Sequence, residues 1–457
     1  MKKEDIYNEI QKCKDINEKL SAQLTDGMVL TKYAYLTRVQ EGMTIWTEAF
    51  QTALNEHEIV YIPHSDEPYY IDNSLIVPSN RRIEVEDKTV IKLVEGTEVL
   101  LIRNKDTADG THSPIKAPKS KNITVIGGIW EETRTTRGGY GTSGMYDRNR
   151  SFYGVSTCMF FNNIENLTIK NVTFVHTGGF AVQVGDIKNA VFENITFVEC
   201  FADGLHINGN SQNIFIRNVK GQVGDDLVAF NMYDWQDSSV NFGPVKTVVC
   251  ENLELSEDST YKAFRILPGT YYYDNGSSVD CSAEDIIIKN VKGINTFKMY
   301  FQTHRYKLGD EPEKGDVGSV DNIYFENIEI DLKEPIDKFS EYLSSDKIKG
   351  SFAAFELGAK IGNISFENIK LKIYKEKWPM SFLVCIGPKS AVINDTEYFN
   401  PSINSYAENL YLSNICVNGD IVSDFNDLIH EIVFVNINGD VYSSGMGEIG
   451  KITVENK

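Results

Sequence analysis

Two short segments of the sequence combine aspartate with glycine and supply the residue types that acid–base chemistry needs. Residues 201–207 read FADGLHI and contain Asp203, and residues 224–231 read GDDLVAFN and contain Asp225 and Asp226. Three carboxylates close together cannot all stay ionised at low cost, so one of them retains a proton and becomes a general acid beside a general base. Cleavage of a glycosidic bond requires such a pair. The sequence therefore predicts a hydrolytic site, provided that the fold brings the three side chains together.

The alternation of apolar residues predicts which way the neighbouring side chains point. Leu205 and Leu227 are 22 residues apart, so we expect them to stack on successive coils of the chain. In that register His206 faces outward and Val228 occupies the corresponding outer position. Arg265, between two apolar residues further along the chain, is expected to face outward on the next coil.

Strict alternation would point Asp203 and Asp225 inward, which is costly for unpaired carboxylates. Gly204 and Gly224 allow a bend or bulge that carries both acids to the outer rim of their strands. Successive coils lie about 4.8 Å apart, so the acidic side chains are expected to cluster on one face. Two other interpretations stay open at this point: the aspartates form turns, or they bind calcium.

A repeated strand pattern is expected to hold these segments. In each copy, alternating apolar residues lead into an asparagine, a further apolar residue and more alternation, and residues 167–174 (LTIKNVTF) are the first clear copy. The asparagines are separated by 22 to 46 residues. The shortest separations give the length of one coil, and the longer ones indicate loops inserted between strands. The repeated residues are Asn171, Asn194, Asn218, Asn252, Asn290, Asn327, Asn368, Asn414 and Asn436.

No helical segment long enough for a crossover separates these strands, so they can lie parallel only if the chain coils. The pattern therefore predicts an all-β fold, a single-stranded parallel β-helix with apolar residues facing its bore. The repeated asparagine suits a turn position at which its side chain bonds to the backbone or stacks in a ladder.

The first part of the chain has helical rather than strand periodicity. We expect residues 1–43 to form a helical extension, with apolar residues at helical spacing from Ile6 to Leu24 and Gly27 ending the helix. Residues 44–457 are expected to form the β-helix catalytic domain. Within it, residues 47–55 read as a short helix that caps the open end of the coil. The extension either packs back on the coil or contacts another subunit, which leaves a homo-oligomer open.

Composition excludes several classes of function. The chain has 45 Lys and Arg against 65 Asp and Glu, a formal net charge of −20, which argues against nucleic acid or an anionic membrane as a partner. It has no run of eighteen apolar residues and no signal-like start, which predicts a cytoplasmic location. Its seven cysteines form no Cys-x-x-Cys pair, which favours reduced thiols over disulfides or a zinc site.

Together, the cap, the coil repeats and the two aspartate segments resemble glycoside hydrolase family 28, the polygalacturonases and their relatives in the pectate-lyase-like β-helix superfamily. The resemblance covers residues 44–440 and implies a right-handed coil that acts on a pectin-derived or related oligosaccharide, without a metal or another cofactor. It implies that Asp225 is the general acid. It also implies that Asp203 and Asp226 hold and activate the water of an inverting displacement.

The sequence departs from the family pattern at three places. Phe201 and Ala202 replace Asn-Thr before the first Asp-Gly, and no histidine lies between Asp226 and His304, where the family has Gly-His-Gly. The family motif Arg-Ile-Lys ends here in Leu267, so its lysine is lost. His206 either replaces the missing imidazole or is a hydrogen-bonded surface histidine.

Residues 301–306 (FQTHRY) resemble a family segment that contacts sugar, so Gln302, His304 and Arg305 join His206 and Arg265 as candidate substrate-binding residues. Arg265 with Arg305 could hold a uronate carboxylate.

A group of arginines before the repeats forms either a cleft wall or a subunit interface; these are Arg134, Arg137, Arg148 and Arg150. A group of tyrosines either stacks on sugar rings or packs within its loops; these are Tyr271, Tyr272, Tyr273 and Tyr300.

Three hypotheses follow from the sequence. The first is an inverting, metal-free glycoside hydrolase, exo-acting because polymers do not enter the cytoplasm. The second is a calcium-dependent polysaccharide lyase of the same fold, with the aspartates as ligands and Arg265 as base. The third is a β-helix that binds carbohydrate without catalysis.

Overall fold

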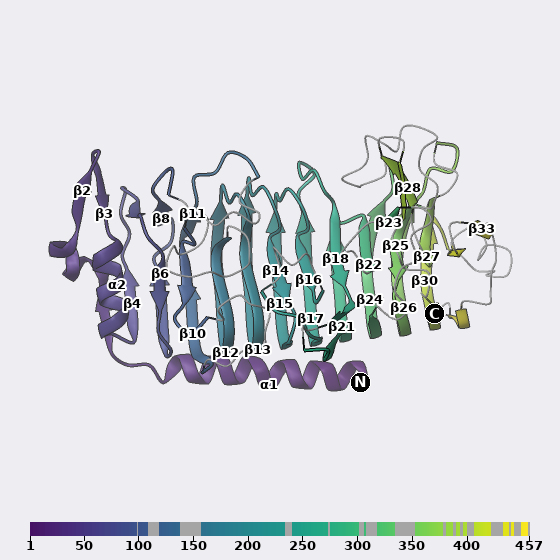
Figure 1. Ribbon diagram of the computed structural model, residues 1–457, viewed down its shortest axis with the longest axis horizontal. Coiled ribbons are helices and arrows are strands. Elements are labelled where there is room, and N and C mark those ends of the chain that lie inside the picture. The colour runs from purple at the N-terminus through teal and green to yellow at the C-terminus, as the bar shows by residue number, and fades with distance from the viewer. Residues whose placement is uncertain are drawn as a thin grey trace.

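The computed structural model shows a long solenoid of mostly parallel strands, drawn in Figure 1 with the coils side by side. It describes the chain except for residues 98, 108–117, 138–156, 234–239, 273–274, 301–305, 308–317, 334–351, 378–380, 387–389, 394–395, 400–405, 422–432, 438–439, 443–448 and 456–457.

The strands stack in three columns, one for each side of the coil, and the longest strands bend through two or three columns. The first column contains the start of β12 (Thr157–Val175) and of β13 (Phe180–Val198). Its other members are β6 (Leu75–Val77), β9 (Ile102–Asn104), β14 (Leu205–Asn208), β16 (Val228–Asn231), β18 (Ala263–Leu267), β22 (Thr296–Tyr300), β25 (Phe352–Gly358), β27 (Ser381–Ile386) and β32 (Val433–Ile437).

The second column continues through the middle of β12 and β13, and the third through their ends. The second column adds β1 (Gly27–Val29), β4 (Ile59–Ile62), β7 (Arg81–Val85), β10 (Ser120–Ile126), β15 (Ser211–Gly221), β17 (Val245–Leu255), β21 (Ala283–Lys292), β24 (Ser319–Asp331), β26 (Lys360–Lys372), β30 (Tyr406–Val417) and β34 (Ile449–Glu455). The third column begins with β3 (Met43–Ile45), β5 (Tyr69–Ile71), β8 (Val90–Leu93) and β11 (Ile129–Glu131).

The remaining strands form hairpins and small sheets outside this stack. They are β2 (Arg38–Gln40), β19 (Gly269–Tyr272), β20 (Ser278–Cys281), β23 (Tyr306–Lys307), β28 (Ser390–Ile393), β29 (Thr396–Phe399), β31 (Asp420–Ile421) and β33 (Asp440–Tyr442).

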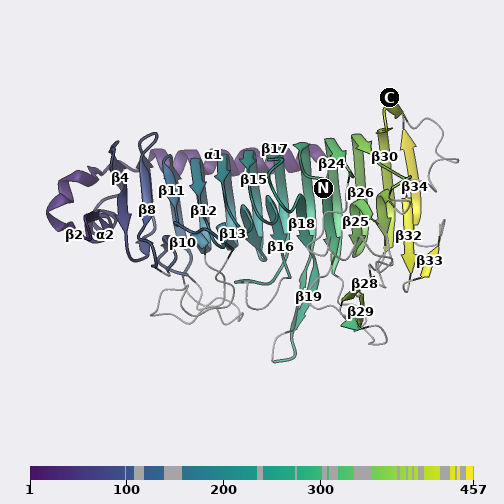
Figure 2. The same cartoon turned by 90° about the horizontal axis from the view of Figure 1, so that it is seen from above.

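The N-terminal helix α1 (Lys3–Ala22) packs back on the coil, which is one of the two alternatives expected from the sequence. Its apolar side contacts the outer face of the second column, where Ile6, Ile10 and Cys13 meet Phe215 and Val249. Figure 2 shows α1 along one side of the solenoid and the β19–β20 hairpin projecting from the opposite side. The helix therefore covers an apolar sheet face and leaves the first column free for other contacts.

The predicted cap is present as helix α2 (Thr47–Glu56), with Phe50, Ala53 and Leu54 buried in the end of the main core. Between α1 and α2 lie β1, the 3₁₀ helix η1 (Leu30–Leu36) and the β2–β3 hairpin. This hairpin pairs Gln40 with Met43 and spans the boundary expected after residue 43.

The repeated asparagines form the expected ladder. Eight of them, from Asn171 to Asn414, have φ between 51° and 59°. Each amide after that of Asn171 donates to the amide oxygen of the asparagine on the preceding coil over 2.8 to 3.1 Å. The left-handed conformation costs most side chains about 1–2 kcal/mol, and asparagine tolerates it because its short polar side chain bonds locally. The repeat is therefore structural.

The ninth asparagine was assigned wrongly. Asn436 lies in β32, which pairs in parallel with β27 of the first column, not with the second or third column that continues from Asn414. The coil that follows Asn414 in the ladder is formed by β34, since Leu410 pairs with Ile452. Asn414 and Asn436 are 22 residues apart, but they lie on two different sides of the coil, so this separation does not correspond to one coil.

The bore is filled by aromatic and branched apolar side chains. Phe230, Phe264, Phe297 and Phe355 are fully buried and follow one another along the first column, with successive ring centroids 5.5, 5.6 and 4.9 Å apart. Offset and edge-on aromatic pairs add to the stabilisation from burial. Because these phenylalanines point inward, the residues directly before and after each of them in its strand must point outward.

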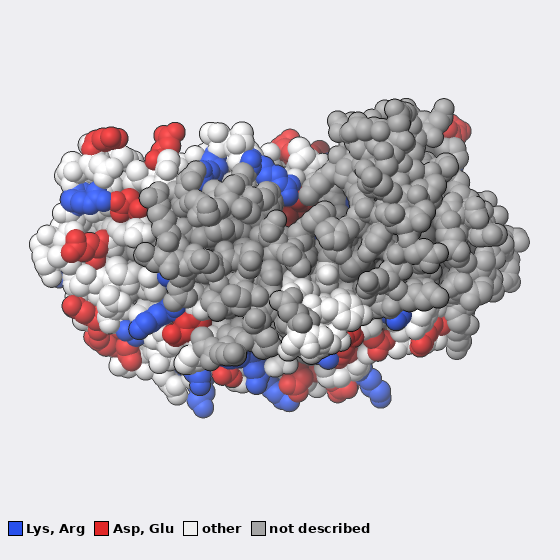
Figure 3. Space-filling model, viewed as in Figure 1, with Lys and Arg blue, Asp and Glu red and all other residues white. Residues whose placement is uncertain are grey.

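Charged side chains of both signs lie on the surface, and most of the described cysteines are buried. Along the lower edge in Figure 3, where Figure 1 places α1, acidic and basic side chains lie side by side. Six cysteines are free thiols in the described part of the chain, and five of them are buried. No helix among the described residues is long and apolar enough to span a membrane.

Glu132 is a buried acid outside the aspartate cluster, and its environment predicts a pH-dependent stability. Burial raises its pKa from 4.5 to about 7, against the lowering effects of the Gly178 N–H, 3.1 Å away, and of Arg134. A raised acid pKa costs nothing below pH 4.5, where both states are protonated. The cost grows to about 3 kcal/mol as pH passes 7.

We therefore expect Glu132→Gln to raise the thermal midpoint at pH 8 and to leave it nearly unchanged at pH 4.5, measured by calorimetry. Glu95→Gln, at an exposed position, is the matched control and should change neither value. An equal gain at both pH values would show that the ionisation of Glu132 is not the cause.

Candidate active site

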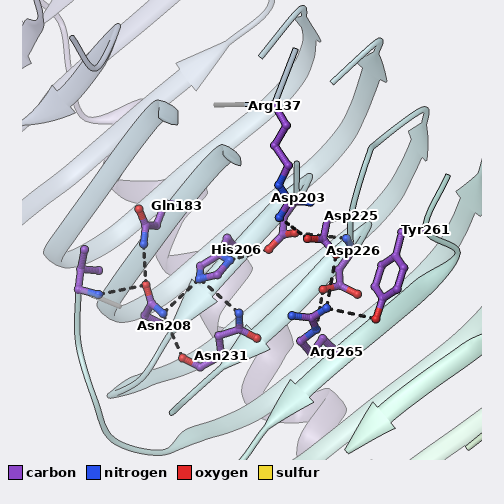
Figure 4. A network of polar contacts seen from close by, with 11 residues as sticks. Arg137, Gln183, Asp203, His206, Asn208, Asp225, Asp226, Asn231, Tyr261 and Arg265 are labelled. Atoms are coloured by element: carbon purple, nitrogen blue, oxygen red, sulfur yellow. Dashed lines mark hydrogen bonds and ion pairs between the residues drawn. The ribbon is translucent and has the colours of Figure 1, made fainter. Parts of the chain in front are cut away.

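The two aspartate segments form adjacent turns that lead into β14 and β16. The Gly204 N–H donates to the carbonyl of Asp226 over 2.9 Å, and the Asp225 N–H donates to the carbonyl of Ala202 over 3.3 Å. Asp203 and Asp226 therefore occupy equivalent places on successive coils. One carboxylate oxygen from each of Asp203, Asp225 and Asp226 lies within 4.8 Å of the other two, so the three side chains converge as the sequence predicted (Figure 4).

The glycines in these turns have a different role from the expected one. A Cβ on Gly204 would lie 2.6 Å from the carbonyl oxygen of Leu227, and one on Gly224 would lie 2.4 Å from that of Phe201. Neither glycine has a positive φ. They are needed because neighbouring coils approach closely here, and the close approach is what brings the acids together.

The register between these two coils differs by one residue from the predicted one, which paired Leu205 with Leu227. Leu205 pairs with Val228, and His206 pairs with Ala229, so one coil measures 23 residues here and not 22. Leu227 instead accepts a hydrogen bond from the Leu205 N–H through its carbonyl. The expected outer position of Val228 was therefore wrong, because Val228 is a core residue and Ala229 takes the outer position.

The outer row of the first column carries most of the polar side chains of the site. Arg265 pairs with Ala229 in the strand register, and Lys298 and Glu356 follow on the next two coils. Residues 103, 160 and 183 precede His206 in the same row. His206, Arg265, Lys298 and Glu356 each have at most 6% of their surface exposed.

Arg265 binds two of the three carboxylates. Its Nε lies 2.8 Å from Asp226 Oδ2, and its Nη2 lies 3.4 Å from Asp225 Oδ1. Nη2 also donates to the Tyr261 hydroxyl over 3.3 Å. Burial alone would lower the pKa of Arg265, but the neighbouring carboxylates, Asp226 most strongly, raise it well above its usual value. Arg265 therefore stays charged and balances part of the acidic cluster.

Arg137 supplies a second cation from the far side of the cluster. It forms an ion pair with Asp225 Oδ2, and its side chain is 33% exposed, while that of Asp225 is 2% exposed. Asp225 thus lies between two guanidinium groups, which favour its ionised form. Arg134, its neighbour in the arginine-rich segment, contacts the backbone of Thr97 instead.

Lys298 is a site residue that sequence reasoning missed. It lies beside Arg265 in the row, and its Nζ is 4.8 Å from the ring centroid of Tyr261. The family lysine was judged lost because Leu267 follows Arg265-Ile266. The structure shows a lysine next to the arginine on the following coil, so the two cations are neighbours in space and not in sequence.

His206 faces outward as expected, but it is not a surface histidine. Only 1% of it is exposed, its ring stacks on Phe180 at 3.7 Å, and its Nδ1 lies 2.7 Å from Asp203 Oδ2. Its Nε2 is 3.3 Å from the amide nitrogen of Asn208 and 3.4 Å from that of Asn231. His206 is therefore enclosed by a polar network that starts at the carboxylate cluster.

The remaining candidates are placed only in part. Gln302, His304 and Arg305 lie outside the described residues, as do Arg148, Arg150 and Tyr273. The ring of Tyr271 stacks on that of Phe242, with the ring centroids 3.8 Å apart, so Tyr271 packs against the connection between β16 and β17. Tyr272 is exposed on the β19–β20 hairpin.

Comparisons with known proteins address the fold. No family model matches the sequence, and no curated protein matches it. A tailspike protein variant of E. coli bacteriophage HK620, solved with a pentasaccharide, has a TM-score of 0.52 at 11% identity, with 86% of this chain and 67% of that chain covered. The chain is a right-handed parallel β-helix.

Two further structures are similar at lower scores. The catalytic domain of a GH87 α-1,3-glucanase, solved with nigerose, has a TM-score of 0.46 at 14% identity, covering 91% of this chain and 67% of that one. An exopolygalacturonase from Thermotoga maritima has a TM-score of 0.41 at 11% identity, covering 90% and 97%. At these identities the likeness concerns the fold, and the chemistry has to be argued from the side chains.

The three aspartates are also the described acidic residues that are grouped closely enough to hold a metal ion. Carboxylate oxygens suit calcium or magnesium. In this cluster, however, Arg265 and Arg137 bind the oxygens of Asp225 and Asp226 that such an ion would need. Two guanidinium groups therefore compete with a divalent cation for the same ligands.

Proposed function

We propose that this protein is a polygalacturonase-like glycoside hydrolase that cleaves glycosidic bonds in uronate-containing or related oligosaccharides by inversion. The observation that carries the proposal is the convergence of Asp203, Asp225 and Asp226 in the turns that lead into β14 and β16. A cluster of three buried carboxylates with two arginines can hold one proton to give and one base to activate water.

The proposed roles follow the family resemblance. Asp225 protonates the leaving oxygen, and Asp203 and Asp226 hold and activate the water. Asp225 is paired with Arg137 and Arg265, which disfavour a proton on it. For Asp225 to act as an acid, one guanidinium has to withdraw, and Arg137 is the more exposed of the two. Bound substrate is thus proposed to draw Arg137 away from Asp225.

The cations beside the cluster support an anionic sugar. Arg265 and Lys298 lie next to each other on the outer row, one and two coils beyond Asp225 and Asp226. Two neighbouring cations suit a uronate carboxylate. We propose exo action as well, and note that the β19–β20 hairpin projects from the solenoid directly after β18, the strand that carries Arg265 (Figure 2).

The stereochemical proposal rests on the resemblance and not on the separation of the acids. Inverting enzymes commonly hold their two carboxyl groups about 6.5–9.5 Å apart, and retaining enzymes about 5–5.5 Å apart. One oxygen from each of the three aspartates lies within 4.8 Å of the others, but this is a distance between single atoms and not between carboxyl groups, so it does not assign the mechanism. The product anomer therefore has to be measured.

The test is release of reducing sugar from a panel of acidic and neutral oligosaccharides, with EDTA present, followed by proton NMR of the first product. We expect hydrolysis of a uronate-containing oligosaccharide from one end, with the anomeric configuration inverted. Retention would overturn the inverting mechanism. An unsaturated product that absorbs in the near ultraviolet and requires calcium would identify a lyase. Binding without turnover across the panel would identify a carbohydrate-binding protein.

A further inference from the structure

The polar network around His206 fixes the proton on a particular ring nitrogen, because the orientation of Asn208 is determined by two backbone groups. The Val240 N–H points at Asn208 Oδ1 over 3.4 Å, and a backbone N–H can only donate. The Asn231 carbonyl lies 3.1 Å from Asn208 Nδ2, and a carbonyl can only accept. The two contacts agree, so the oxygen and nitrogen of this amide are assigned independently of the histidine.

The assignment is supported by a third contact. The Gln183 amide donates to Asn208 Oδ1 over 2.9 Å from the preceding coil. With Oδ1 accepting from Gln183 and Val240, the Asn208 amide nitrogen faces His206 Nε2 (Figure 4). The Asn231 amide nitrogen faces the same ring atom over 3.4 Å. Two N–H donors thus point at Nε2, which has to accept.

A histidine whose Nε2 accepts carries its proton on Nδ1. The Nδ1–H of His206 then donates to Asp203 Oδ2 over 2.7 Å, and the Asp226 N–H donates to Asp203 Oδ1 over 3.3 Å. An imidazolium would carry a proton on Nε2 as well, and this N–H would point at the N–H groups of Asn208 and Asn231 without an acceptor between them. Asp203 is a charged group in hydrogen-bond contact with the ring, and Ala229 separates His206 from Arg265 in the row.

We propose that His206 is a positioning residue for Asp203, held as the neutral Nδ1–H tautomer by Asn208 and Asn231. It orients the Asp203 carboxylate with one neutral hydrogen bond and leaves it free to act as a base. This inference rests on the proposed function for its catalytic consequence, but the tautomer itself does not depend on any activity. It replaces the expectation that His206 contacts the substrate.

The experiment measures the tautomer directly in the full-length protein. Histidines labelled with ¹⁵N give different Nδ1 and Nε2 shifts for each tautomer and for the imidazolium, and loss of one signal in His206→Gln assigns the residue among the seven histidines. We expect His206 to be neutral with its proton on Nδ1 from pH 5.5 to 8. A protonated Nε2 at pH 7 would overturn the proposal, whether or not a substrate is known.

The discriminating variant is Asn208→Asp, which has nearly the same shape but places a carboxylate against Nε2. We expect His206 to become an imidazolium in this variant at neutral pH. Because an imidazolium favours the ionised form of Asp203 and weakens it as a base, kcat should fall by about 10- to 100-fold with KM unchanged. The acidic limb of the pH–rate profile should move to lower pH.

Two controls separate positioning from folding. Asn55→Asp makes the same chemical change on an exposed residue of α2 and should alter neither the spectrum of His206 nor kcat. His206→Gln keeps an N–H donor near Asp203 and should retain more activity than His206→Leu. A fall in activity in Asn208→Asp with the pH profile unmoved would show a structural role only and would overturn the proposal.

Discussion

Replacing any one of Asp203, Asp225 and Asp226 with asparagine is expected to lower glycan turnover by about 10³-fold or more, because each change removes an acid or a base from the proposed reaction. The side chains are at most 3% exposed and nearly isosteric with asparagine, so the fold should be kept. The measurement is kcat/KM for reducing-sugar release on the best oligosaccharide from the panel.

The three variants should differ when the leaving group changes. An aryl glycoside with an acidic phenol needs little protonation as it departs. Asp225→Asn, which removes the proposed acid, should therefore recover much of its activity on such a substrate. Asp203→Asn and Asp226→Asn, which remove the groups that activate water, should remain inactive on both substrates.

The matched control is Asp87→Asn, an exposed aspartate in the turn between β7 and β8, which should keep full activity. Full activity in Asp226→Asn would contradict the proposed arrangement, because Asp226 would then serve only to balance Arg265. Recovery of Asp203→Asn in place of Asp225→Asn on the aryl glycoside would exchange their roles.

The coil and its ladder could be predicted from the sequence because the asparagine repeat has one physical cause. A position that requires a positive φ on every coil selects asparagine, and its amide then bonds to the next one. The same cause produces a second ladder that the sequence analysis did not identify. Asn122, Asn166, Asn189 and Asn213 are linked amide to amide over 2.8 to 3.0 Å at the preceding turn.

The site could be predicted where its residues lie in equivalent turns of successive coils. Asp203 and Asp225 each adjoin a glycine in such a turn, and Asp226 follows Asp225, so the convergence of the three followed from the repeat. The exact register between β14 and β16 did not follow from the repeat. One additional residue in a turn exchanges the inner and outer positions of the strand that follows it. Val228 was misplaced for this reason.

The position of Lys298 beside Arg265 is encoded in a repeated triplet of residues. Three strands of the first column repeat one pattern of phenylalanine, charged residue and apolar residue: FRI at 264–266, FKM at 297–299 and FEL at 355–357. Aligning these triplets places Arg265, Lys298 and Glu356 in one outer row, as the structure has them. Insertions of different length between the strands hid this alignment from an argument based on spacing.

The outward direction of His206 followed from the alternation, but its tautomer could not be predicted. It depends on Asn208 and Asn231, on Gln183 from the previous coil and on the Val240 N–H from a connection after β16. These groups meet only after folding, and no spacing in the sequence relates them.

Arg265→Met is expected to destabilise the protein by about 3–5 kcal/mol at neutral pH and to abolish activity. Removing one partner from a buried ion pair leaves the other charge uncompensated, and here the partners are two carboxylates, those of Asp225 and Asp226. The loss should shrink as pH falls, because protonation of the carboxylates removes the unpaired charge. The thermal midpoint of wild type and variant, measured from pH 4 to 8, checks both the size and the direction.

Arg217→Met is the matched control on the outer face of the second column. Arg217 Nε lies 2.7 Å from Glu193 Oε1, but the arginine side chain is 35% exposed, so water replaces the lost ion pair. A surface pair of this kind contributes about 0–1 kcal/mol. If Arg265→Met loses the same stability at pH 4 and at pH 8, its role is packing against Tyr261 and not charge balance. In that case the three carboxylates must be neutralised in another way, and the assignment of Asp225 as the residue that carries the proton would gain support, since a protonated Asp225 needs no cation beside it.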